Sequence, residues 1–236
     1  MHKLYRWMFR IASGVFLIGI VGLIIIMALT NVAMDEMDDI LSLPYVSEQD
    51  NVIVFQQEDY LANIVIYPGG LVEAHAYAKL AYLLHEEGYR VFIVRMPLNL
   101  AILNRGAFED IVGAYESEFP WYGLGHSLGG ASLAYVDVGL LEGLILLGSY
   151  FPGSVDISET DLNVLSITAE FDEVLDWDNY EARKTLLPSG SVHVMIAGGN
   201  HANFGYYGSQ RGDGDATISR LKQHQLVVAE IVSFID

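Results

Sequence analysis

The sequence predicts an α/β fold in which a mainly parallel β-sheet is flanked by helices. Short apolar runs alternate with segments of helical periodicity along most of the chain, as expected for parallel strands joined by crossover helices. Breakers such as Pro68 and Gly88 separate these runs. Polar residues follow several of the runs directly, where the carboxyl ends of parallel strands bring them together. We therefore look for functional residues at that edge of the sheet.

The predicted elements come in a regular order along a chain of 236 residues, which is long enough for one large domain of this kind. Apolar runs bounded by turn residues predict strands at residues 51–56, 63–67, 89–94, 121–124, 143–147, 164–169 and 192–197. Apolar residues every three or four positions predict helices at residues 72–87, 98–118 with an interruption near Gly106, 128–138, 179–187 and 215–234.

The first thirty residues predict a single-pass membrane anchor. Residues 11–29 carry no charge, and ~20 apolar residues suffice to cross a bilayer as a helix. Basic residues precede this run and acidic residues follow it: Lys3, Arg6 and Arg10 on one side, and Asp35, Glu36, Asp38 and Asp39 on the other. The positive flank predicts a cytoplasmic N-terminus at the cell membrane, with the rest of the chain extracytoplasmic.

A cleaved signal peptide and a buried helix are the competing interpretations of this run. Residues 31–33 (Asn-Val-Ala) form a poor cleavage site, which favours the uncleaved anchor. The domain division that follows has four parts: a cytoplasmic basic segment (1–10), a transmembrane signal anchor (11–30), an acidic linker (31–49) and one α/β catalytic domain (50–236).

The charge and the cysteine content exclude several classes of function. Beyond the three basic residues at the N-terminus, nine Lys and Arg residues stand against 30 Asp and Glu residues, which gives a formal charge of −21. Such a surface repels nucleic acid, so nucleic acid is not an expected partner. The chain has no cysteine, which excludes disulfides, thiolate catalysis and Cys-ligated metals. No metal site and no cofactor are expected.

The segment Gly125–Gly129 reads Gly-His-Ser-Leu-Gly and fits the nucleophile-elbow pattern, in which a serine sits on a sharp strand-to-helix turn. A predicted strand precedes it and a predicted helix follows it, as that structure requires. Glycines next to the serine allow the strand and the helix to cross closely. Ser127 is therefore the candidate nucleophile.

A serine hydroxyl needs a neighbouring base, and near neutral pH that base is a histidine. In the class of fold that contains this elbow, the partners follow the serine in the order Asp or Glu, then His. His201 follows the last predicted strand, whereas His193 falls in a predicted strand, and His75, His85 and His224 fall in predicted helices. Asp172 follows the preceding strand. Four further acidic residues crowd the same loop and stay open as alternatives: Glu170, Glu173, Asp176 and Asp178.

These motifs resemble the α/β-hydrolase superfamily, and in particular its compact bacterial carboxylesterase-like and dienelactone-hydrolase-like members. Residues 68–70 (Pro-Gly-Gly), the elbow, Asp172 and His201 fall in the family's order, and the similarity covers residues 50 to 236. The resemblance implies that Ser127 is the nucleophile, that His201 is the general base and then acid, and that Asp172 orients the imidazole. It also implies an α/β-hydrolase fold.

The resemblance further implies an oxyanion hole and a substrate pocket. The backbone N–H of Leu128, directly after the nucleophile, is expected to be one oxyanion donor, and the N–H of either Gly70 or Leu71 the other. Three residues near the predicted strand ends are candidates for the pocket: Glu73, His126 and Phe204.

The segment between the strands at 143–147 and 164–169 is too short for a large cap domain, so the site is expected to be open. The predicted function is that of a membrane-anchored serine hydrolase that cleaves small carboxylic esters through an acyl-enzyme. Acyl transfer or peptidase chemistry by the same triad is an alternative, and a non-catalytic binding module of the same fold is another.

Overall fold

The computed structural model describes residues 2–49 and 51–236, and within helix α1 (His2–Leu29) it leaves the side chains of 2–6, 9, 10, 12–14, 17 and 20 undescribed. The chain forms two compact units, one that ends at Thr30 and one that spans Asn31–Asp236. Asp50, which begins the predicted α/β domain, lies outside the described residues.

The membrane anchor predicted for residues 11–30 is wrong. Across the part of the chain that the structure describes, no helix has both the length and the apolar character needed to cross a bilayer. The prediction rested on the absence of charged residues from this run. A membrane span requires more, namely a helix that is apolar throughout. The basic flank of Lys3, Arg6 and Arg10 lies outside the residues whose side chains are described.

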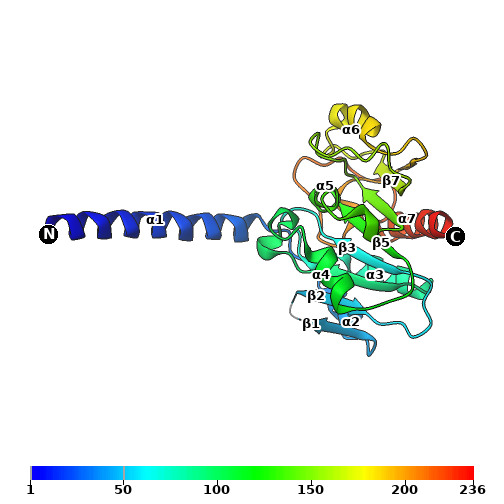
Figure 1. Ribbon diagram of the computed structural model, residues 1–236, viewed down its shortest axis with the longest axis horizontal. Coiled ribbons are helices and arrows are strands. Elements are labelled where there is room, and N and C mark those ends of the chain that lie inside the picture. Colours follow the sequence, from blue (N-terminus) through cyan, green and yellow to red (C-terminus); the bar gives the residue numbers. More distant parts are fainter. Residues whose placement is uncertain (1, 50) are drawn as a thin grey trace. The chain divides into compact units, whose positions relative to one another are not determined.

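The second unit is built on an eight-stranded sheet in the order β1-β2-β4-β3-β5-β6-β7-β8 (Figure 1). The strands are β1 (Val46–Gln49), β2 (Val52–Phe55), β3 (Asn63–Tyr67), β4 (Arg90–Val94), β5 (Trp121–His126), β6 (Gly143–Leu147), β7 (Asn163–Ala169) and β8 (Val192–Ile196). Strand β2 is antiparallel to both β1 and β4, and the strands from β3 to β8 are parallel. The predicted, mainly parallel sheet is confirmed.

Helices cover both faces of this sheet, because alternate residues of each strand point to opposite sides. The helices are α2 (Glu36–Leu41), α3 (Ala78–Glu86), α4 (Ala107–Ala114), α5 (Leu128–Leu133), α6 (Trp177–Arg183) and α7 (Arg220–Ile235). In β3, Ile64 and Ile66 join the core beneath α2, α3 and α7, whereas Val65 and Tyr67 join the core beneath α4 and α5. Short 3-10 turns are η1 (Ala74–Tyr77), η2 (Pro97–Asn99), η3 (Ala101–Leu103), η4 (Val138–Leu140), η5 (Lys184–Leu186) and η6 (Ala202–Phe204).

Residues 31–49, expected as an acidic linker, hold helix α2 and strand β1 and belong to the second unit. Met37 is only 2% exposed, and Ile40 and Leu41 pack against the same core. These residues have the i, i+3, i+4 spacing of one helix face, which the surrounding acidic residues obscure in the sequence. This segment is therefore part of the packed domain.

Candidate active site

Ser127 lies on the sharp turn between β5 and α5, with φ 50° and ψ −119°. This conformation costs a non-glycine residue roughly 1–3 kcal/mol, and such strain is held only where the surroundings fix it. A Cβ on Gly129 would lie 2.1 Å from the carbonyl oxygen of Tyr67, and one on Gly125 would lie 2.4 Å from the Cα of Gly130. Both contacts are with backbone atoms, so the turn requires glycine at these two positions.

The backbone of Ser127 is held by the neighbouring strand β6. Its N–H donates to the carbonyl of Leu147 at 2.9 Å, and its carbonyl accepts from the hydroxyl of Ser149 at 2.7 Å. The turn is thus fixed from the side on which β6 ends. The serine side chain projects from the carboxyl edge of the sheet, where ligands bind in open α/β folds.

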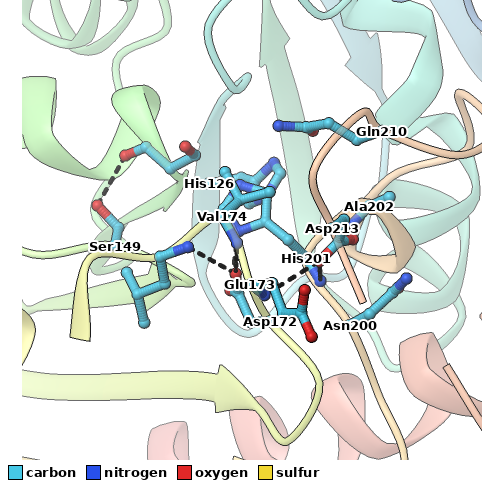
Figure 2. Close-up of polar contacts among 12 residues, drawn as sticks. His126, Ser149, Asp172, Glu173, Val174, Asn200, His201, Ala202, Gln210 and Asp213 are labelled. Atoms are coloured by element: carbon cyan, nitrogen blue, oxygen red, sulfur yellow. Dashed lines mark hydrogen bonds and ion pairs between the residues drawn. The ribbon is translucent and has the colours of Figure 1, made fainter. Parts of the chain in front are cut away.

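Asp172 and His201 form a buried pair at the ends of β7 and β8. Asp172 Oδ2 lies 2.8 Å from His201 Nδ1, and both residues are 2% exposed (Figure 2). The other carboxylate oxygen, Oδ1, accepts from the N–H groups of Val174 and Leu175 at 3.0 and 2.8 Å. A carboxylate only accepts, so Nδ1 carries the ring proton and Nε2 keeps its lone pair for another proton.

Two of the acidic neighbours of Asp172 that remained open as alternatives are engaged elsewhere. Glu170 accepts from the N–H of Gly198 at 2.8 Å. Asp176 caps helix α6, where it accepts from the backbone and side-chain amides of Asn179 at 3.0 and 2.6 Å. Of the carboxylates in this loop, Asp172 is the one that meets the imidazole of His201.

Asp213 holds the loop of Asp172 and the loop of His201 together, a contact that the sequence did not indicate. Its carboxylate accepts from the N–H of Ala202 at 2.7 Å, of His201 at 3.3 Å and of Glu173 at 3.4 Å (Figure 2). It does not cap α7, the last helix, whose N-cap is Ser219. Acceptors for backbone N–H groups in other loops leave no signal in a linear motif.

A cavity of about 260 Å³ lies beside the turn and is lined by residues from several strand ends. These include Ser127, Leu128, Ser149, Tyr150, Leu175 and His201. Over the described residues, no hydrogen bond joins the hydroxyl of Ser127 to the imidazole of His201, although both face this cavity. Catalytic hydrogen bonds are often long in ligand-free structures and tighten when substrate binds.

His126 does not line this cavity but lies buried next to His201. It is 1% exposed, and its ring centroid is 4.5 Å from that of His201. Burial, and then the neighbouring His201 and His224, hold the pKa of His126 well below its usual value, so the ring is neutral. It therefore places no positive charge beside His201.

The hydroxyl of Tyr77 joins His126 to the loop after β3. It accepts from the N–H of Gly69 at 2.8 Å and lies 2.7 Å from His126 Nδ1. Burial raises the pKa of Tyr77, so its hydroxyl keeps its proton and donates it to Nδ1. These two hydrogen bonds fix Gly69, the first glycine of the loop that is expected to form the oxyanion hole.

The other two pocket candidates also lie away from the cavity. Phe204 is buried against His126, with ring centroids 5.5 Å apart. The carboxylate of Glu73 accepts from the N–H of Ala33 at 2.9 Å. Tyr150, Leu175 and Ala131 line the cavity instead.

The loop after β3 contains an N–H group that has no acceptor among the described residues. Gly70 lies against Leu128, because a Cβ there would be 2.9 Å from Leu128 Cδ2. The N–H of Leu71 donates to the carbonyl of Asn99 at 2.7 Å, whereas that of Gly70 has no acceptor among the described residues. Leu128 is the first residue of α5, and N–H groups at a helix start have no partner within the helix. Gly70 and Leu128 thus each offer an unengaged donor.

Among the residues that the structure describes, no three His, Cys, Asp or Glu side chains gather so as to hold a metal ion.

Three solved structures share this fold with the chain. A dienelactone hydrolase from Anabaena variabilis superposes with a TM-score of 0.58 at 11% identity, covering 77% of this chain and 90% of its own. Carboxylesterase CesB from Bacillus subtilis gives 0.59 at 12% identity, covering 85% and 95%. A CIB-like hydrolase from Thermoplasma acidophilum gives 0.61 at 14% identity, covering 80% and 98%. Identities this low show a common fold alone.

Sequence comparison gives the family. No curated protein sequence matches the chain. The model of the alpha/beta hydrolase family matches residues 63–225, a stretch that contains the turn of Ser127, Asp172 and His201. Because this match covers well over half of the chain, the protein belongs to the alpha/beta hydrolase family.

Proposed function

We propose that the protein is a serine hydrolase that cleaves small carboxylic esters through an acyl-enzyme. The observation that carries this proposal is the joint position of Ser127 and the Asp172–His201 pair. A serine in a strained backbone conformation and an imidazole oriented by a buried carboxylate line one cavity. This is the set of groups that acyl transfer to a serine requires.

In the proposed reaction the hydroxyl oxygen of Ser127 attacks the ester carbonyl while Nε2 of His201 takes its proton. The negative charge that develops on the carbonyl oxygen is stabilised by the N–H groups of Leu128 and Gly70. His201 then donates its proton to the departing alcohol. A water molecule, deprotonated by the same nitrogen, hydrolyses the acyl-enzyme and frees Ser127. Asp172 holds the imidazole in the required tautomer throughout.

The surroundings of the cavity favour water as the acyl acceptor and small esters as substrates. In the described chain, the segment between β6 and β7 contains no helix that covers the cavity. Water therefore has access to the acyl-enzyme. A volume of about 260 Å³ is slightly below the usual range for small-molecule sites, which supports a short acyl group.

The proposal is tested by labelling the protein with a fluorophosphonate probe, which reacts with activated serines. We expect one adduct per chain, located on Ser127 by peptide mass spectrometry, and parallel loss of hydrolysis of a short p-nitrophenyl ester. Ser149 is an internal control, because it faces the same cavity but its hydroxyl donates to the backbone carbonyl of Ser127. An adduct on Ser149, or no adduct together with no ester hydrolysis, rejects the proposal.

A second expectation concerns Gly148, which follows β6 with φ 50°. A Cβ at this position would lie 3.0 Å from both Asp172 Oδ2 and His201 Nδ1. Gly148→Ala is therefore expected to displace the pair and lower kcat/KM at least about tenfold, since misplacement by ~1 Å costs up to about a hundredfold. Ester hydrolysis and the thermal midpoint are measured together.

Gly153→Ala is the matched control, because a Cβ at Gly153 meets no atom within 4 Å. It lies in the same segment and is expected to keep the activity of the wild type. Equal activities of the two variants would show that the pair tolerates the added methyl group.

A further inference from the structure

The segment Asn31–Met34 lies outside the range matched by the family model, yet it is bonded to the loop that carries Gly70. The N–H of Asn31 donates to the carbonyl of Leu71 at 2.7 Å, and the carbonyl of Asn31 accepts from the N–H of Glu73 at 3.1 Å. Asn31 and Val72 form a parallel bridge. Asn31 thus pairs with the loop through a single β-bridge.

A side chain adds a further bond to this contact. The carboxylate of Glu73 reaches back and accepts from the N–H of Ala33 at 2.9 Å. At its far end, the N–H of Met34 donates at 2.8 Å to the carbonyl of Tyr206, shortly after the turn that begins at His201. The segment therefore contacts both the loop after β3 and the chain that follows His201.

Leu71 has an uncommon backbone conformation that these contacts maintain. Its φ is 56°, in the left-handed region that side chains with a Cβ rarely occupy. Both polar groups of its backbone are engaged, the N–H by the carbonyl of Asn99 and the carbonyl by the N–H of Asn31. Asn99 itself has φ 55°. Strained residues persist where neighbouring structure fixes them, and here Asn31 is part of that structure.

The N–H groups on either side of Gly70 in the loop are engaged. Gly69 donates to the hydroxyl of Tyr77, and Leu71 donates to Asn99. Gly70, between them, finds no acceptor in the described part of the chain and lies against Leu128. Fixing the two flanking peptides fixes the direction of the Gly70 N–H.

We propose that the segment Asn31–Met34 is a positioning element of the oxyanion hole, and that Glu73 is the positioning residue that fastens it. The segment holds Leu71 in its left-handed conformation and thereby aims the N–H of Gly70 at the carbonyl oxygen of the substrate. This inference rests on the proposed function. It also gives Glu73 a role that requires no contact with substrate.

The test uses the full-length chain with Glu73 replaced in two ways. Glu73→Ala removes the acceptor for the Ala33 N–H, whereas Glu73→Gln keeps a carbonyl oxygen in its place. Ala33→Pro removes the donor of the same bond. Glu109→Ala is the matched control, because Glu109 in α4 likewise accepts from a backbone N–H, that of Asp137 after α5. Amide hydrogen exchange of residues 69–73 and the rate of fluorophosphonate labelling of Ser127 are measured for each.

We expect Glu73→Ala and Ala33→Pro to raise exchange in residues 69–73 and to slow labelling about tenfold, as partial misplacement of an oxyanion donor does. The exchange and the labelling rate of Glu73→Gln are expected to stay within about twofold of the wild-type values, because the hydrogen bond is required and the charge is not. Glu109→Ala is expected to change neither quantity.

Unchanged exchange in Glu73→Ala overturns the proposal, as does raised exchange with an unchanged labelling rate. An equal defect in Glu73→Gln also overturns it. Absence of labelling in the wild type is a different failure, that of the proposed function. In that case the role of the segment in the oxyanion hole is rejected together with the proposed function. Amide hydrogen exchange then still shows whether the segment holds the loop in place.

Discussion

Ser127→Ala is expected to lower kcat for a short ester by about a million-fold, the loss typical of removing the nucleophile of a serine hydrolase. Without the hydroxyl, the Asp172–His201 pair has no oxygen to activate and no acyl-enzyme forms. Alanine carries the same Cβ into the strained conformation at φ 50°, so the fold is expected to persist. Steady-state hydrolysis is measured alongside circular dichroism.

The control for this substitution is Ser132→Ala in the adjoining helix. Ser132 is also buried, but its hydroxyl donates to the carbonyl of Leu128 and does not line the cavity. Loss of the Ser132 hydroxyl is expected to change kcat by far less than loss of the Ser127 hydroxyl does. A Ser127→Ala variant that retains turnover within about tenfold of the wild type would exclude the mechanism.

Asp172→Asn is expected to lower kcat by about 10⁴-fold, because it reverses the tautomer of His201. Two N–H groups, from Val174 and Leu175, point at Oδ1 and keep the amide oxygen of the new side chain there. The amide nitrogen then faces His201 Nδ1 and presents a donor where an acceptor is needed. The imidazole responds by moving its proton to Nε2, which can no longer act as a base.

The controls for Asp172→Asn are Glu173→Gln and Asp176→Asn in the same loop. Asp176 caps α6, and asparagine caps a helix as well as aspartate does, so Asp176→Asn is expected to change neither stability nor turnover much. Thermal midpoints and steady-state kinetics measure the two quantities. Near-normal rates in Asp172→Asn, together with a large loss of activity in either control, would show that another carboxylate orients His201.

The sequence predicted most of the sheet because each strand is a short apolar run bounded by breakers. Strand β3 was expected at 63–67 and spans Asn63–Tyr67. The turn of Ser127 was predictable for a related reason, since its glycines are required by contacts of Gly125 and Gly129 with neighbouring backbone. Local constraints of this kind leave a signature in consecutive residues.

Contacts between distant segments were not predictable in this way. Glu73 was expected in the pocket because it follows the glycine loop, but its partner is the N–H of Ala33, forty residues away. The helix predicted at 98–118 is regular only over Ala107–Ala114. Before it, Leu98 and Asn99 take positive φ values that end any helix. Periodicity reports which residues are apolar but not which loops the chain brings together.

The hydrogen bonds that Asp213 makes to two loops affect how the site is disrupted when the protein begins to unfold. Its carboxylate ties the N–H groups of Glu173, His201 and Ala202, so the ends of β7 and β8 share one acceptor. Segments that share such contacts open as one cooperative unit, below the free energy of global unfolding. Asp172 and His201 should then leave the native arrangement in a single step. Inactivation by heat or denaturant would therefore precede the melting of the central strands and pass through no state that retains only one of the two residues.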